Sequence, residues 1–200
     1  AGRILQDLDK FRTRESVSVS GIRHRVTDDR IRNIREEDPT DNSVWHDFGE
    51  NDRWGGYRSH AAFVAQVEVP ESFRGLDAYI AVDTGLSEGW DATNPQFLVY
   101  VDGEARQALD KNHRSSRLMD EVFGGETFEL YFSSYTAEIK EDQLFRLKLE
   151  ARDPRVNQLY YDLKVAVEAA SLMEMETESF LTIIHAVNDT INLLDLRQPF

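Results

Sequence analysis

The side chains best suited to chemistry lie in one short run, "LVYVDGEARQALDKNHR" (98–114), which ends with Asp110, Asn112 and His113. A carboxylate, an amide and an imidazole can bind hydroxyl groups or move protons. They supply no nucleophile and no bound metal, so a complete catalytic site is not indicated. Two interpretations stay open: a polar loop at the lip of a pocket or at a domain interface, or a surface turn in which Asp and Asn bond their own backbone.

Metal and nucleophile motifs are absent from the sequence. None of the histidines stands in a His-x-x-x-His or His-x-Asp arrangement; they are His24, His46, His60, His113 and His185. The chain has no cysteine, which excludes disulfides and thiolate metal sites, and it contains no Gly-x-Ser-x-Gly turn. We therefore expect no catalytic residue, metal or cofactor in this chain.

A second candidate is the aromatic stretch from Trp45 to Tyr57, which also contains Trp54 and several polar residues. Aromatic rings beside polar groups can bind sugars, because the C–H faces of a sugar pack on rings while its hydroxyls need hydrogen bonds. The alternative is that these rings cover an edge or end of the fold, since large aromatics dominate ordinary packing. We take Trp45, Trp54 and Tyr57 as candidates for a substrate lip or domain interface.

The composition of the chain limits the classes of partner that we expect it to bind. The 200 residues carry a net charge of −14, which would repel a phosphate backbone, so nucleic acid is not an expected partner. The apolar runs are too short to span a membrane, and the charged N-terminus does not resemble a secretory signal. We expect a cytoplasmic location. The chain also begins without Met, as a fragment would.

Hydrophobic periodicity places the elements that position these residues. Apolar residues at helical spacing in 1–14 predict an N-terminal helix. Several short alternating runs between 61 and 153, separated by turns, predict antiparallel strands. From Pro154, with Asp153 as cap, two helical stripes predict a hairpin of helices. The predicted fold is mainly β: an antiparallel sandwich of jelly-roll or galactose-binding-like type (15–153), with an N-terminal helix (1–14) and a C-terminal helical hairpin (154–200).

The order of four segments resembles the N-terminal region of family 38 α-mannosidases of the bacterial, cytosolic and vacuolar type: "WHDFGENDRWGGYRSHAAFVAQVEVPESFRG", "PQFLVYVDGEARQALDKNHR", "GGETFELYFSSYT" and "QLYYDLKVAVEAA". The resemblance covers most of residues 40–170. It implies a β-sandwich domain that precedes a zinc-dependent, retaining catalytic domain. The family's His-x-Asp zinc motif does not occur here, so zinc, nucleophile and acid/base are expected outside this chain.

The resemblance implies a non-catalytic domain of an α-mannosidase that supports the catalytic domain of the same polypeptide and contacts between subunits, with a homo-oligomer as a possible assembly. A chain cut from such a protein should expose an apolar patch where its neighbour packed. The last two helices and the aromatic stretch near 45–57 are the candidates. The alternative is a self-sufficient carbohydrate-binding module for mannose-containing glycans.

Overall fold

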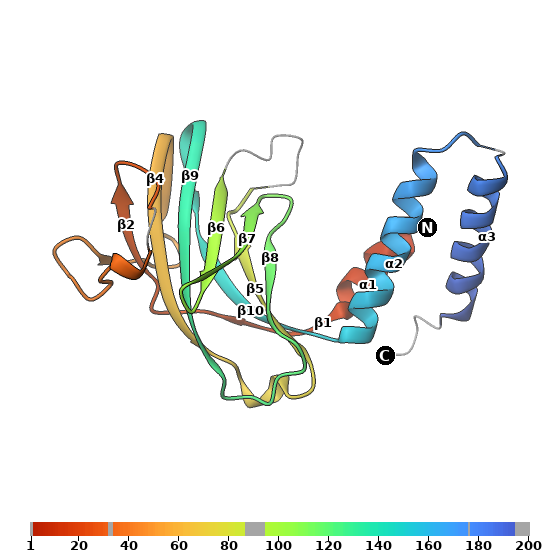
Figure 1. The fold of residues 1–200 in the computed structure, drawn as a ribbon, viewed down its shortest axis with the longest axis horizontal. Helices are drawn as coiled ribbons and strands as arrows, with labels where there is room; N and C mark the ends of the chain where they lie inside the picture. Colours follow the sequence, from red (N-terminus) through yellow and green to blue (C-terminus); the bar gives the residue numbers. More distant parts are fainter. Residues whose placement is uncertain (1, 32–33, 87–94, 176, 195–200) are drawn as a thin grey trace. The chain divides into compact units, whose positions relative to one another are not determined.

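The computed structural model describes residues 2–31, 34–86, 95–175 and 177–194 (Figure 1). The chain divides into two compact units. One contains Ser16–Glu150 and is built from strands. The other combines Ala1–Glu15 with Ala151–Phe200 and is mainly helical.

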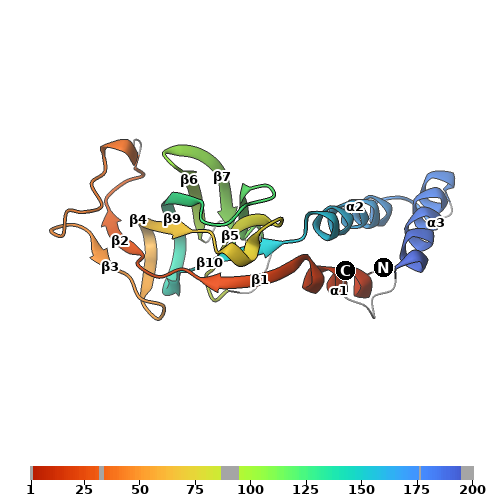
Figure 2. The ribbon, with the colours of Figure 1, turned by 90° about the horizontal axis from the view of Figure 1, so that it is seen from below.

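Two antiparallel sheets form the strand unit (Figures 1 and 2), which confirms the predicted β-sandwich with helices at both ends of the chain. The four-stranded sheet has the order β1 (Thr13–Ser18), β10 (Arg146–Arg152), β5 (Asp77–Asp83), β8 (Ser115–Met119). The six-stranded sheet has the order β3 (His46–Asp47), β2 (Arg23–Thr27), β4 (Arg53–Glu68), β9 (Thr127–Leu144), β6 (Gln96–Val101), β7 (Glu104–Asp110).

Aromatic rings fill the space between the sheets. Phe63 on β4 stacks on Phe145 at the start of the β10 segment, with ring centroids 4.0 Å apart and planes at 14°. Phe132 packs edge-on against Phe145 at 5.2 Å, and Phe97 lies 5.6 Å from it. All four rings are at most 2% exposed. Their alternation with outward residues is what the period-two pattern predicts, and their buried area makes them the main apolar contribution to this core.

The outer face of the six-stranded sheet is partly covered as well. Trp45, from the segment before β3, packs edge-on against Tyr131 of β9 at 6.1 Å. Arg25 lies over the Trp45 ring at 5.4 Å and pairs with Glu37 at 2.5 Å. Burial, together with the charge of Glu37, raises the pKa of the Tyr131 hydroxyl, while Arg25 opposes this shift. Ile31 belongs to the same buried cluster, so part of segment 31–45 covers this face.

The helical unit contains α1 (Gly2–Arg12), α2 (Pro154–Ser171) and α3 (Glu178–Leu193). The Asp153 side chain caps α2 by accepting hydrogen bonds from the backbone N–H groups of Arg155 and Val156, and it also binds Arg14 at 2.9 Å. Pro154 occupies the first turn, where no backbone donor is needed. Within the part of the chain that the structure describes, no helix is both long and apolar enough to cross a membrane.

The strand that differs most from the sequence prediction is β4. The sequence predicts strands only from residue 61 onward, but β4 begins at Arg53 and continues to Glu68. Gly55 and Gly56 adopt φ values of 110° and 97°, and the pairing with β9 shifts register between Gly55 and Tyr57. Glycines weaken a strand signal, yet here they form a bulge that lets the strand continue. Strands β1, β2, β3 and β8 are also missing from the sequence prediction, and the last two residues of the predicted helix 1–14 belong to β1.

Candidate functional site

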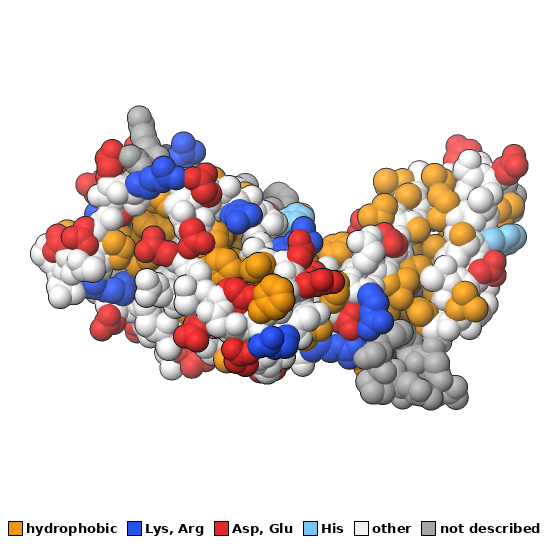
Figure 3. Space-filling model, turned by 60° about the horizontal axis from the view of Figure 1, so that its bottom comes forward, with side chains coloured by type: hydrophobic (Ala, Val, Ile, Leu, Met, Phe, Trp, Pro, Cys, Tyr) orange, Lys and Arg blue, Asp and Glu red, His pale blue; other side chains and the backbone are white. Residues whose placement is uncertain are grey.

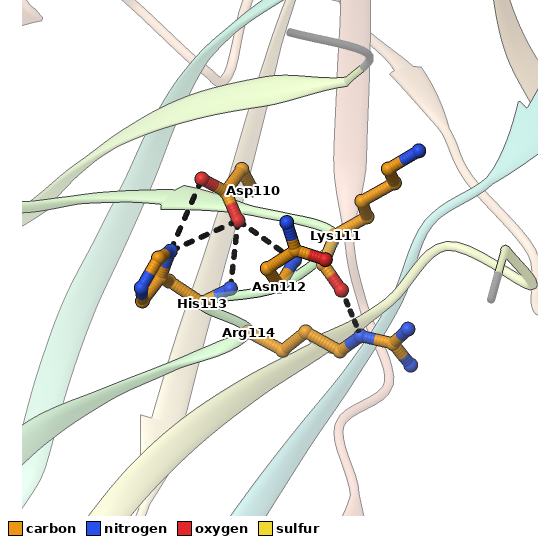
Figure 4. A network of polar contacts seen from close by, with 5 residues as sticks. All are labelled: Asp110, Lys111, Asn112, His113 and Arg114. Carbon is orange, nitrogen blue, oxygen red and sulfur yellow. Dashed lines mark hydrogen bonds and ion pairs between the residues drawn. The ribbon is translucent and has the colours of Figure 1, made fainter. Parts of the chain in front are cut away.

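The loop from Asp110 to Arg114 connects β7 of one sheet to β8 of the other. Figure 4 shows how the Asp110 carboxylate organises it: Oδ1 accepts hydrogen bonds from the backbone N–H groups of Asn112 and His113, each at 2.7 Å. The His113 ring nitrogen Nδ1 lies 3.2 Å from both carboxylate oxygens. The backbone N–H of Asp110 donates to the carbonyl of His113 at 3.0 Å, which closes the turn.

The electrostatics keep Asp110 charged. Burial works against ionisation, but the N–H groups of His113 and Asn112 and the His113 ring together hold the pKa of Asp110 below its ordinary value. The His113 side chain itself is 73% exposed. The loop therefore presents an imidazole to solvent from a backbone that the carboxylate has fixed.

The Arg114 side chain stabilises the other end of this loop through hydrogen bonds. Its Nε donates to the carbonyl of Lys111 at 2.5 Å (Figure 4), and its Nη2 donates to the carbonyl of Leu86 at 2.8 Å. The guanidinium thus ties the loop to the segment after β5 through two backbone carbonyls. This geometry accounts for the local role of Asp110 as a turn former. A role of Asp110, Asn112 and His113 at a pocket lip or domain interface stays a prediction.

The three aromatic candidates do not form one platform. Trp45 is 1% exposed in the outer cluster against Tyr131, whereas Trp54 is 3% exposed between the sheets, 5.3 Å from Phe63. Tyr57 is 64% exposed, with Arg58 over its ring at 5.2 Å. Only Tyr57 among the three offers a ring face to solvent in this conformation. The contribution of these residues to an interface stays a prediction.

No metal centre is assembled among the residues that the structure describes: they contain no group of three or more His, Asp or Glu residues that could hold an ion. His24 and His46 face each other across β2 and β3. Burial and the neighbouring His46 lower the pKa of His24, while Asp52 opposes the shift. Two imidazoles without a third ligand do not make a zinc site, and the zinc that the resemblance implies is expected in the catalytic domain outside this chain.

The helical unit exposes an apolar surface. In α3 only Val187 is buried, although Phe180, Ile183, Ile184 and Ile191 share its apolar stripe and are half-buried. Figure 3 shows hydrophobic side chains gathered over the helices. Large apolar side chains exposed on or beside α2 and α3, here called the helical apolar face, are Tyr161, Val165, Leu172, Met173, Met175, Leu181 and Leu193. Their exposed fractions reach 89% at Leu172 and 86% at Leu193.

Comparison with known proteins finds similarity in fold alone. No protein-family model and no curated protein matches this chain. Among solved structures, a β-glucuronidase from an uncultured Clostridium aligns with 71% of this chain and 30% of its own, at 9% identity and a TM-score of 0.46. A glycosyl hydrolase family 2 member from Bacteroides cellulosilyticus aligns with 70% of this chain and 21% of its own, at 11% identity and a TM-score of 0.44.

These structures are family 2 enzymes and not members of family 38. The chain spans about a third or less of their length. At such identities and TM-scores the likeness concerns a β fold that also occurs within glycoside hydrolases, and it carries neither a family nor an activity.

Proposed function

We propose that this chain is a non-catalytic domain of a larger glycoside hydrolase, in which the helical apolar face packs against a neighbouring domain of the same polypeptide. The observation that carries this proposal is the exposure of that face. Leu172, Met175 and Leu193 are 79–89% exposed, in a chain whose sandwich buries its large rings almost completely. Exposed large apolar side chains in such number are typical of an interaction site.

The state of α3 supports packing against a further partner. Its Thr177 cap and its apolar stripe are those of an ordinary amphipathic helix, with the Thr177 side chain accepting a hydrogen bond from Phe180 N–H. Such a helix normally buries its stripe, because packing rather than propensity supplies most helical stability in proteins. Here only Val187 is buried, while Ile183 and Ile191 are half-buried against the cluster that Val187 forms with residues of α1 and α2. A neighbour that covers the exposed side of α3, where Leu181 is 42% exposed, would supply burial beyond that given by α1 and α2.

The finer proposal is that the larger protein is a zinc-dependent, retaining α-mannosidase of family 38. Four ordered sequence motifs support it, among them the one that ends in Asp110, Asn112 and His113. Zinc and the nucleophile would then belong to the catalytic domain. The fixed loop from Asp110 to Arg114 would make polar contacts at the lip of that domain's pocket. The same helical apolar face could alternatively join two copies of the chain.

The test compares the natural full-length protein with the 200-residue chain, using 4-nitrophenyl α-D-mannopyranoside with and without added zinc. We expect turnover by the full-length protein only, and slower amide exchange of α3 in the full-length protein than in the chain. A second comparison uses Leu181→Asp in the full-length protein, with Glu178→Asp as a control on the same helix. Leu181→Asp should lower the melting temperature more than Glu178→Asp does.

Turnover by the 200-residue chain alone would refute the non-catalytic assignment. Equal amide exchange of α3 in both proteins would refute the docking role. Turnover of another glycoside by the full-length protein would refute the mannosidase assignment alone. Concentration-dependent dimers of the 200-residue chain that Leu181→Asp abolishes would reassign the helical apolar face to subunit contact.

A further inference from the structure

Strand register builds a continuous row of polar and aromatic side chains across the outer face of the six-stranded sheet. His60 of β4 pairs with Tyr135 of β9, Tyr135 pairs with Gln96 of β6, and Gln96 pairs with Asp110 of β7. Residues directly opposite each other in antiparallel strands point to the same face. The row therefore brings together four side chains that lie up to 75 positions apart in sequence.

The neighbouring row on the same face is made of small or slender residues. Ala62 pairs with Ser133, Ser133 pairs with Leu98, and Leu98 pairs with Ala108. The next row on this face contains the large side chains of Tyr131 and Tyr100, which pack with Trp45 in the outer buried cluster. The row from Ala62 to Ala108 thus lies between two rows of larger side chains, and this difference in side-chain size creates a hollow on the face of the sheet.

This hollow has a volume of about 450 Å³. That lies within the roughly 300–1,000 Å³ of typical small-molecule sites. Its floor includes Leu98, Ala108 and Ser133, and its rim includes the row from His60 to Asp110 together with Arg30 from the segment after β2. All of these residues belong to the strand unit, so the hollow is complete within Ser16–Glu150.

The rim combines an aromatic wall with an unpaired ring nitrogen and a carboxylate. The His60 and Tyr135 rings lie 4.7 Å apart at 34°, so each covers one face of the other. His60 Nδ1 is buried and has no hydrogen-bond partner within the described part of the chain. Asp110 Oδ1 accepts from two backbone N–H groups and lies 3.2 Å from the His113 ring, whereas Oδ2 has that ring as its one partner among the described residues. Buried polar atoms are normally paired, and a ligand hydroxyl could pair with either group.

We propose that this hollow is a binding site for a neutral pyranose sugar. The sugar's apolar C–H face would lie against Leu98, Ala108 and the Tyr135 ring. Its hydroxyls would bond to the carboxylate of Asp110 and the amide of Gln96. Asp110 Oδ2 can accept from one hydroxyl, and an amide both donates and accepts, which suits a ligand that carries several hydroxyl groups.

The charges of the site favour a neutral ligand over an anion. Arg30 and Asp110 place one positive and one negative group on the rim, and the chain as a whole carries −14. A phosphate or uronate would approach against that field, with a single arginine in its favour.

The experiment is a calorimetric titration of the 200-residue chain with methyl α-D-mannopyranoside and methyl β-D-glucopyranoside, and with sodium glucuronate and adenosine as comparisons. Ala108→Phe would fill the hollow from the exposed edge strand. Gln107→Phe is the matched control, because residue 107 is also exposed but its side chain points to the other face of β7. Gln96→Ala removes a rim amide without filling space.

We expect saturable binding of at least one neutral glycoside, in the millimolar range or tighter. Ala108→Phe should weaken it by more than about tenfold and Gln96→Ala by about threefold or more, whereas Gln107→Phe should leave it within about twofold. No saturation with either glycoside, equal loss in both Phe variants, or tighter binding of glucuronate or adenosine would overturn the proposal. The outcome is independent of the proposed docking role, which is tested by turnover and exchange in the longer protein.

Discussion

The substitution Asp110→Ala probes how much of the loop from Asp110 to Arg114 depends on one carboxylate. It removes the acceptor of two backbone N–H bonds at 2.7 Å and the partner of the His113 ring at 3.2 Å. A net bond of this kind contributes about 0.5–1.5 kcal/mol, and water can replace part of it because Asp110 is 20% exposed. The exposed ring contact adds at most about 1 kcal/mol.

We therefore expect Asp110→Ala to lower the free energy of unfolding by about 1–2 kcal/mol. For a chain of this size that corresponds to about 2–4 °C in melting temperature per kcal/mol. Asp110→Asn should cost less, because its Oδ1 can still accept both N–H groups. Lys111→Ala is the control, since only the backbone carbonyl of Lys111 takes part in the hydrogen bonds of the loop. Urea titration followed by tryptophan fluorescence gives the free energies, and amide exchange at 111–114 shows whether the loss is local.

The pH dependence provides a second check. The pKa of Asp110 is lowered in the folded state, with burial opposing the hydrogen bonds of His113 and Asn112. Its contribution is therefore present above the unfolded pKa, near 3.9, and is lost as the pH falls through the lower folded value. The stability difference between the parent chain and Asp110→Asn should be largest above about pH 5 and shrink below about pH 4. A cost for Asp110→Ala no greater than that for Lys111→Ala, or a difference independent of pH, would refute the capping argument.

Two further predictions concern the scaffold. Asp153→Ala removes the cap of α2 and the 2.9 Å partner of Arg14, and should lower the free energy of unfolding by about 2–4 kcal/mol in urea titrations followed by the helical circular dichroism signal. The control is Arg155→Ala, whose side chain is 87% exposed and whose loss should cost under about 0.5 kcal/mol. Similar costs for the two variants would contradict a stabilising role of the Asp153 cap. Gly124→Ala would place a Cβ 2.6 Å from the Glu71 Cα at φ 89°, whereas Gly75→Ala at φ 78° meets nothing within 4 Å. Thermal melts should show a loss of about 1–2 kcal/mol for Gly75→Ala and a further 1–3 kcal/mol for Gly124→Ala, and equal losses would show that the backbone near Glu71 yields.

Local chemistry explains why the sequence predicted part of the candidate site. Asp102-Gly103 forms the turn between β6 and β7, with φ values of 51° and 81°, because Asp and Gly tolerate the left-handed region that a tight hairpin requires. The polar character of 110–113 and the tendency of Asp to bond its own backbone were visible as well. The further contact of Arg114 with Leu86 was not predictable, since it joins residues 28 positions apart.

The sequence by itself determined the elements whose signals are local. Alternation predicted strands such as β5, β6 and β10, and Asp153-Pro154 predicted the start of α2, because a strand period and a helix cap need only neighbouring residues. Tertiary structure alone decided which rings are buried and where a hollow forms. Trp45 and Trp54 lie close in sequence but pack in different layers, and the row from His60 to Asp110 exists only because four strands adopt one register. Register is set by the sum of many distant contacts, which no single stretch of sequence contains.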